Sequence, residues 1–187
     1  MQVLRKYRIF VALKMTYIMA TIIRKEERDY QPHPGRIDGF RLLTDQSRER
    51  HGIHPQWLNF DLRQLNPGQY CAAYHFHRYA EEIFLILAGA ATLRTPEGLT
   101  VVGEGDILFF EAGESGAHQL YNHTDAPCTY LDLRSHRGHD VCEYPDSDKI
   151  ILVPHGETYR RSDQLPYFDG ETNIRRIWAQ LSHQDAK

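Results

Sequence analysis

The sequence predicts an all-β fold in which short strands close into a small barrel. Apolar segments are separated by turn-forming residues at intervals of roughly 8–12 residues, which is typical of β-sandwiches and barrels. Residues 57–63 alternate apolar and polar side chains, as a strand with one buried face does. Pro96, Glu97 and Gly98 separate two further apolar segments and indicate a hairpin.

The chain divides into a barrel and two arms. Residues 26–55 are polar and contain repeated proline and glycine, so we expect residues 1–56 to form an N-terminal arm. The barrel is expected over residues 57–151, and a C-terminal arm over residues 152–187. In chain order, the predicted strands of the barrel are residues 57–63, 70–77, 82–88, 91–95, 99–102, 107–110, 118–122 and 128–134.

A short amphipathic helix is predicted in the C-terminal arm. Four apolar side chains recur there at the spacing of one helical face: Ile174, Ile177, Trp178 and Leu181. We expect this face to cover part of the barrel surface. Contact with a second subunit is the alternative.

Charge and cysteine content limit the classes of partner and location. The formal net charge of -3 gives no electrostatic case for binding nucleic acid or an anionic membrane. Lys14 interrupts the apolar run of residues 9–23, which is therefore a poor match to a membrane span or a secretory signal. Cys71, Cys128 and Cys142 lack the spacing of a disulfide framework, so we expect a reducing, cytoplasmic location.

Three histidines and one glutamate in the barrel region have the chemistry of a metal site. His75 and His77 lie one residue apart on a predicted strand, so both imidazoles point to the same face. A carboxylate, from Glu82 or its neighbour Glu81, follows the next turn, and His118 comes from a later strand. Nitrogen and oxygen ligands of this kind suit one divalent transition metal ion, namely Fe, Mn, Ni, Co or Zn.

Two stretches around these residues resemble the motifs of the cupin superfamily. Residues 68–89 contain the pattern His75-x-His77-x4-Glu82-x6-Gly89, which is similar to the first motif. Residues 105–122 are similar to the second, although Glu111 stands in place of a proline and the loop before the histidine is longer. Residues 141–150 also resemble a segment of small, single-domain bacterial cupins that have no assigned activity.

The resemblance implies a jelly-roll barrel and a set of site residues. The metal ligands that it implies are His75, His77, Glu82 and His118. It favours Glu82 over Glu81, because the spacing from Glu82 to Gly89 fits the first motif. It gives Asn122 a structural position, and it implies a homodimer.

Function stays open among several classes, because cupins include dioxygenases, decarboxylases, isomerases and lyases as well as sensors and storage proteins. We expect a metal-dependent enzyme with a small, oxygen-rich ligand such as a sugar or a carboxylate. The alternative is a non-catalytic cupin that holds a metal or senses a ligand.

No catalytic residue is assigned from the sequence. Arginines that could bind a phosphate are Arg63, Arg94 and Arg134. Residues that could transfer protons are Glu81, Tyr70 and Gln119, but we favour a rim or turn position for each of these three.

Overall fold

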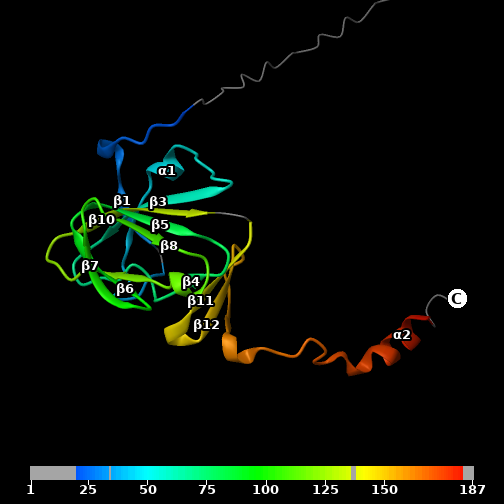
Figure 1. The fold of residues 1–187 in the computed structure, drawn as a ribbon. Coiled ribbons are helices and arrows are strands. Elements are labelled where there is room, and N and C mark those ends of the chain that lie inside the picture. Colours follow the sequence, from blue (N-terminus) through cyan, green and yellow to red (C-terminus); the bar gives the residue numbers. More distant parts are fainter. Residues whose placement is uncertain (1–19, 34, 136–137, 183–187) are drawn as a thin grey trace, which may run out of the picture.

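The computed structural model describes residues 20–33, 35–135 and 138–182 of the 187-residue chain. Antiparallel strands enclose a barrel, from which the N-terminal and C-terminal segments extend (Figure 1). Most of the apolar run at residues 9–23 lies outside the described residues. No helix in the described part of the chain is long and apolar enough to cross a bilayer.

The largest sheet has six strands in the order β1-β2-β3-β10-β5-β8. Their bounds are Tyr30–Pro32 for β1, Leu43–Asp45 for β2, Leu58–Leu65 for β3, Cys128–Ser135 for β10, Glu82–Ala88 for β5 and Ile107–Phe110 for β8. All neighbouring pairs are antiparallel. The sheet supplies most of the barrel wall behind the candidate site.

Two smaller sheets complete the barrel. The first has the order β13-β12-β11-β4, with bounds Glu157–Arg160, Lys149–Val153, Asp140–Tyr144 and Phe76–His77. The second has the order β7-β6-β9, with bounds Gly98–Gly103, Ala90–Thr95 and Gln119–Tyr121. The β6–β7 pair confirms the predicted hairpin. The all-β barrel is therefore confirmed.

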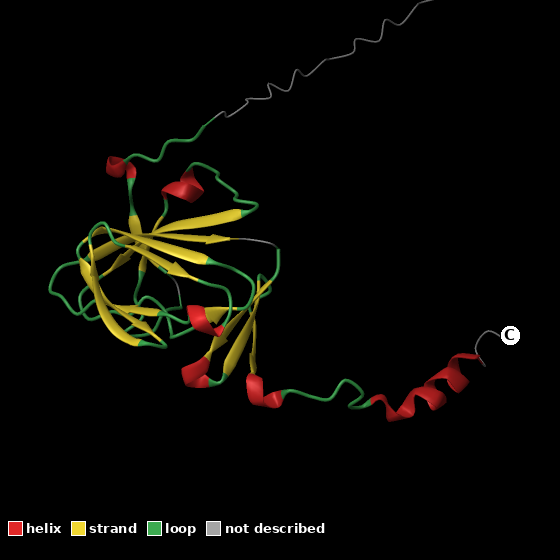
Figure 2. Cartoon of the chain, viewed as in Figure 1, coloured by secondary structure: helices red, strands yellow, loops and turns green. Residues whose placement is uncertain are grey.

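Helices are short and lie outside the barrel wall (Figure 2). The α-helices are α1 (Ser47–Arg50) and α2 (Ile174–Ser182), and the 3-10 turns are Lys25–Glu27, Glu114–Gly116, Pro145–Ser147, Arg161–Asp163 and Glu171–Asn173. The predicted amphipathic helix is α2. Its apolar side chains are 45–67% exposed, and the helix projects away from the barrel (Figure 1). The prediction that it covers the barrel is wrong.

The core is built by alternation along the central strands. In β5, Phe84 and Ile86 are buried, and in β10 Cys128 and Tyr130 are buried, with Tyr130 opposite Ile86. Side chains at these positions share one face of their strand because the side-chain period of a strand is two. The same alternation directs Glu82, the first residue of β5, to the inside.

Residues 26–55 are more ordered than their composition predicts. Strands β1 and β2 extend the large sheet, and Leu42 is buried against its core. The buried Asp45 carboxylate accepts hydrogen bonds from the Asp29 N–H and the Ser47 hydroxyl. Hydrogen bonds to a buried carboxylate thus help to hold a segment that has few apolar residues.

The predicted continuous strand over residues 70–77 is wrong. Only Phe76 and His77 form the β4 ladder, and isolated bridges join Tyr70 to Tyr121 and His75 to His118. Between the bridges, the Gln119 side-chain amide donates a hydrogen bond to the Ala72 carbonyl. A side chain therefore takes an acceptor that a backbone ladder would use.

Candidate metal centre

A cavity of about 180 Å³ lies inside the barrel. Residues of β3, β5 and β10 line it together with residues of β4 and β11. His75, His77 and Glu82, three of the four expected ligands, are part of this lining. Glu82 is buried, whereas Glu81 is exposed. Of the two glutamates, only Glu82 therefore lies inside the barrel, as expected of the candidate ligand.

The four side chains come together in space. Candidate ligand atoms of His75, His77 and Glu82 all lie within 4.8 Å of one another. Glu82 Oε2 lies 3.5 Å from His77 Nε2 and 3.1 Å from His118 Nε2. The His75 and His118 ring centroids are 4.8 Å apart. One small cation among His75, His77 and Glu82 would reach a nitrogen or oxygen donor of each. His118 is outside that group of three and adjoins it through its contact with Glu82.

Each imidazole is oriented through its Nδ1 atom. His75 Nδ1 lies 2.9 Å from the Ala73 carbonyl, and His118 Nδ1 lies 2.9 Å from the Gly116 carbonyl. His77 Nδ1 lies 2.5 Å from Asp140 Oδ2. An Nδ1–H that donates to these oxygens leaves Nε2 as the nitrogen that is free to coordinate an ion.

Two buried polar atoms in this cluster have no hydrogen-bond partner among the described residues. They are Glu82 Oε2 and His118 Nε2, the pair that is 3.1 Å apart. Burying such atoms without a partner is unfavourable, because their interactions with water are lost. A cation that accepted both lone pairs would remove this penalty, so the donor set fits a metal ion.

The electrostatics of the cluster favour metal-binding protonation states at two positions. Burial, with repulsion from His118, lowers the pKa of His75 to about 3, so this ring is neutral at physiological pH. Burial alone would raise the pKa of Glu82, but the surrounding imidazoles outweigh it and lower that pKa. Glu82 is therefore a carboxylate, the form that binds cations.

Comparison with known proteins identifies the domain that contains these side chains. The cupin domain family model matches residues 62–134, the segment that carries all four side chains. Residues 62–134 of this chain form a cupin domain. No curated protein matches the chain.

Solved structures share the cupin fold. A sugar phosphate isomerase of a cupin superfamily from Silicibacter pomeroyi is 26% identical, with a TM-score of 0.61, over 76% of this chain and 92% of that chain. A candidate sugar phosphate isomerase from Acidithiobacillus ferrooxidans is 21% identical, with a TM-score of 0.66, over 78% and 95%. The polyketide cyclase RemF from Streptomyces resistomycificus is 18% identical, with a TM-score of 0.51, over 65% and 84%.

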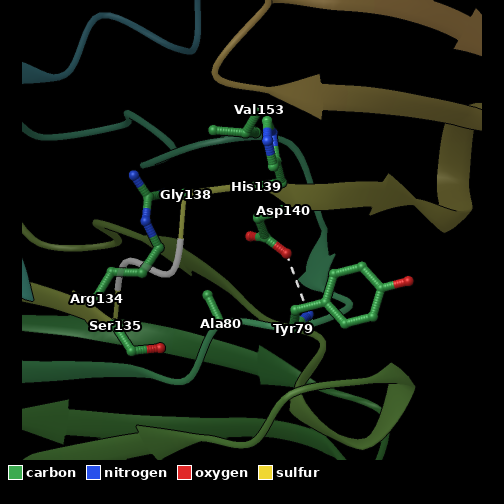
Figure 3. A pocket seen from close by; sticks show the side chains of 8 residues that line it. All are labelled: Tyr79, Ala80, Arg134, Ser135, Gly138, His139, Asp140 and Val153. Carbon is green, nitrogen blue, oxygen red and sulfur yellow. Dashed lines mark hydrogen bonds between the residues drawn. The ribbon is translucent and has the colours of Figure 1, made fainter. Parts of the chain in front are cut away.

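Asp140 supports the His77 ring from outside the cavity of this cupin. Its Oδ1 atom accepts hydrogen bonds from the N–H groups of Tyr79 and Val141, while Oδ2 faces His77. Figure 3 shows the bond to Tyr79 at the edge of a second, smaller cavity, which Arg134 also lines. Burial would lower the pKa of His77, but the hydrogen bond with Asp140 outweighs it and raises that pKa to about 10.

Cys142 lies beside the same ring. Its Sγ atom is 3.2 Å from His77 Nδ1, and His77, Asp140 and Cys142 form a second group of side chains that could hold an ion. Because the Asp140 carboxylate already occupies His77 Nδ1, we interpret Asp140 and Cys142 as groups that orient the ring. The sequence carried no signal for either, since both belong to a strand far along the chain.

The longer loop before His118 still fixes that residue in the cupin barrel. The Gly113 N–H donates to the His77 carbonyl at 2.7 Å. A Cβ atom on Gly116 would lie 1.9 Å from the Glu111 carbonyl oxygen, so only glycine fits this turn. The His118 ring stacks on Phe110 with centroids 3.7 Å apart. With the longer loop, the His118 ring is buried and its Nε2 atom lies 3.1 Å from Glu82 Oε2.

Two of the three arginines suggested as phosphate ligands line the cavity that contains the candidate metal ligands. They are Arg63 and Arg134. Arg94 instead forms an ion pair with the exposed Asp146. Of the suggested proton-transfer residues, Glu81, Tyr70 and Gln119, none lines this cavity.

The cavity also contains three polar residues that the sequence did not suggest, Arg36, Asp132 and Tyr144. Burial and the neighbouring Glu82 carboxylate raise the pKa of Asp132 to about 7. Burial raises the pKa of Tyr144 to about 12, and its ring stacks on His75 at 5.6 Å. Arginine and tyrosine donors therefore surround the proposed metal ligands.

Proposed function

We propose that this cupin binds one divalent transition metal ion through His75, His77, Glu82 and His118, and that it is an enzyme for a small, anionic sugar such as a sugar phosphate. The observation that carries the proposal is the buried contact between Glu82 Oε2 and His118 Nε2, two atoms that have no hydrogen-bond partner among the described residues. The bound ion would act as a Lewis acid toward adjacent substrate oxygens.

The size and polarity of the cavity support a small, oxygen-rich substrate. Its volume of about 180 Å³ is below the roughly 300–1,000 Å³ of sites for drug-sized ligands. Arg36 and Arg134, which form no ion pair with the described residues, line it and favour negative charge in a ligand. The Silicibacter pomeroyi structure named as a sugar phosphate isomerase, at 26% identity, supports the same substrate class.

A non-catalytic cupin that holds a metal or senses a ligand is the second candidate. The observation that favours it is that Glu81, Tyr70 and Gln119 lie away from the cavity lining. Metal binding with anion binding but without turnover of any sugar phosphate would support this alternative.

The location and assembly are also proposals. Cys71, Cys128 and Cys142 are buried and unpaired, which fits the reducing conditions of the cytoplasm. The exposed apolar side chains of α2 suit contact with a second copy of the chain, and we propose a homodimer.

Metal analysis of protein purified without a histidine tag tests the first part of the proposal. We expect about one ion per chain, and we expect Glu82→Gln and His118→Ala to lose it. His123→Ala is the matched control, because His123 is exposed and bonded to Thr92. Equal metal content in all four proteins would refute the proposed site.

Activity is tested on the metal-loaded protein. Aldose phosphates should be converted to ketose phosphates, or the reverse, and product should be detected by NMR. Loss of conversion on chelation, with recovery on adding the metal, would support the enzyme. Metal uptake with no conversion of any sugar phosphate would favour the second candidate.

A further inference from the structure

The arginines of the metal cavity differ in how their charge is balanced. Arg63 donates to Asp61 at 2.7 Å and to Asp132 at 3.3 Å, and it also bonds the Thr44 hydroxyl. Burial would lower the pKa of Arg63, but the two carboxylates outweigh it and raise that pKa. Arg63 therefore belongs to a closed ion-pair network that stabilises the barrel wall.

Arg36 has no such compensation. Its Nη1 atom donates to the Cys71 carbonyl at 2.8 Å, and no carboxylate of the described residues lies within ion-pair distance of its guanidinium. Burial, with repulsion from Arg63, lowers the pKa of Arg36. A part-buried cation on a cavity wall without a counterion is unfavourable unless an anion joins it.

The segment that carries Arg36 is held against the barrel at several points. The Tyr70 N–H donates to the Gly39 carbonyl at 2.7 Å, and the Arg41 N–H donates to the Gln69 side chain. The Phe40 ring contacts the Tyr70 ring at 5.6 Å, and Leu42 is buried in the core. These contacts fix the backbone that follows Arg36, so the guanidinium is positioned before a ligand arrives.

Tyr144 adds a second unused donor. It lines the same cavity, and its hydroxyl makes no hydrogen bond with the described residues. Its ring stacks on His75, so the hydroxyl-bearing ring lies directly beside the proposed metal ligands. The cavity thus presents metal-binding groups and unused anion-binding donors together.

We propose that Arg36, with the Tyr144 hydroxyl, binds the anionic group of the substrate, a carboxylate or a phosphate. Arg36 is then the residue that determines specificity for anions. The proposal rests on the proposed function for the presence of a substrate in this cavity, but not for its metal. A guanidinium suits both oxyanions, because its N–H groups can pair with two oxygens at once.

Anion titrations test the proposal. The dissociation constants of inorganic phosphate and of glycolate are measured by calorimetry on the protein as purified and on the metal-loaded protein. Arg36→Gln should raise the dissociation constant of at least one of the two anions by about tenfold or more. Arg41→Gln is the matched control, since Arg41 lies on the same segment but is exposed and paired with Asp38, and it should leave both constants unchanged.

Arg36→Met provides a second variant, because it keeps the apolar stem of the side chain and removes only the charged group. Thermal unfolding identifies which variants fold, and either folded variant decides the question. If the Arg36 variants lose more affinity for phosphate than for glycolate, the subsite binds a phosphate group. If they lose more affinity for glycolate, the subsite binds a carboxylate.

The proposal is overturned if neither anion binds the native protein, if the folded Arg36 variants bind as tightly as the native protein, or if Arg41→Gln weakens binding equally. These outcomes are separable from failure of the metal site. A protein that takes up no metal yet loses anion affinity in Arg36→Gln refutes the metal proposal alone. A protein that binds metal with unchanged anion affinity in Arg36→Gln refutes only the role of Arg36.

Discussion

Asp140 Oδ2 lies 2.5 Å from Nδ1 of His77, so a carboxylate outside the cavity orients one of the proposed metal ligands. The other Asp140 oxygen is held by the N–H groups of Tyr79 and Val141, which fixes the carboxylate itself. Outer groups of this kind set the orientation and basicity of an imidazole ligand.

Replacing Asp140 should therefore weaken metal binding. We expect Asp140→Asn to reduce metal affinity about 10–100-fold, because a neutral amide supports the His77 ring less strongly. Competition with a chromogenic chelator measures the affinity. Asp125→Asn, at an exposed turn position, is the control and should match the native protein. Unchanged affinity in Asp140→Asn would show that His77 needs no outer carboxylate.

Gly116 should be intolerant of any side chain. An alanine Cβ would meet the Glu111 carbonyl oxygen at 1.9 Å, so the turn before His118 must shift. We expect Gly116→Ala to lower the free energy of unfolding by about 2–4 kcal/mol and to reduce metal content. Gly103→Ala is the control, since its Cβ would lie 3.9 Å from the nearest atom. Equal urea midpoints for the two variants would contradict this account.

Asn122 should stabilise the barrel without touching a ligand. Its fully buried amide donates to the carbonyls of Leu65 and Ala126, and its Oδ1 accepts from the Thr124 N–H. Asn122→Ala leaves these groups without partners, and we expect a loss of about 2–4 kcal/mol in urea unfolding. The exposed Asn173→Ala should change stability little. A loss confined to metal binding would instead indicate a direct role at the site.

The thiols of Cys71 and Cys128 should be unreactive in the folded protein. Burial raises the pKa of each thiol to about 11, so at about pH 8 only about one in a thousand is ionised. We expect alkylation at these two cysteines, followed by peptide mass spectrometry, to be much slower than in urea. Rapid alkylation of the native protein would contradict the burial of these thiols.

The same shifts predict a loss of stability in alkali. Between the ordinary thiol pKa of 9.0 and the folded value of about 11, the unfolded chain releases its protons more readily than the folded one. The free energy of unfolding should therefore fall as pH rises through this range, relative to a Cys128→Ala variant.

The exposed apolar side chains of α2 should form the contact of the proposed homodimer. Ile177→Ser combined with Trp178→Ser should convert a dimer to a monomer in sedimentation velocity, because the double change removes exposed apolar area. Arg175→Ser combined with Arg176→Ser changes the same helix at neighbouring positions and should leave the mass unchanged. A native protein that sediments as a monomer would contradict the assembly.

The sequence was most informative where local pattern determines structure. Strand alternation predicted the barrel and the β6–β7 hairpin, because a period of two assigns each side chain to a face. Motif spacing selected Glu82, which the structure buries, over the exposed Glu81. Pattern failed at residues 70–77, where the Gln119 side chain replaces ladder hydrogen bonds. It also failed for α2, because periodicity identifies an apolar face but not what covers it.

Arg36 could not be predicted for a different reason. Nothing in the polar segment around it signals a site, and its position depends on the pairing of β2 with β3 in the folded sheet. Asp140 and Cys142 likewise reach His77 only through the β11–β4 pair, which joins residues more than sixty positions apart. Contacts of this range are set by topology, which a single sequence does not encode in its local pattern.

The segment that carries Arg36 precedes the barrel in the chain, whereas the proposed metal ligands all lie within residues 75–118. The proposed metal ligands and the main anion-binding side chain would therefore lie on separate stretches of polypeptide. Replacing the β1–β2 connection with a different sequence should therefore change which anions bind in the barrel and leave metal binding unchanged. Related proteins could differ in substrate preference through changes in that connection alone.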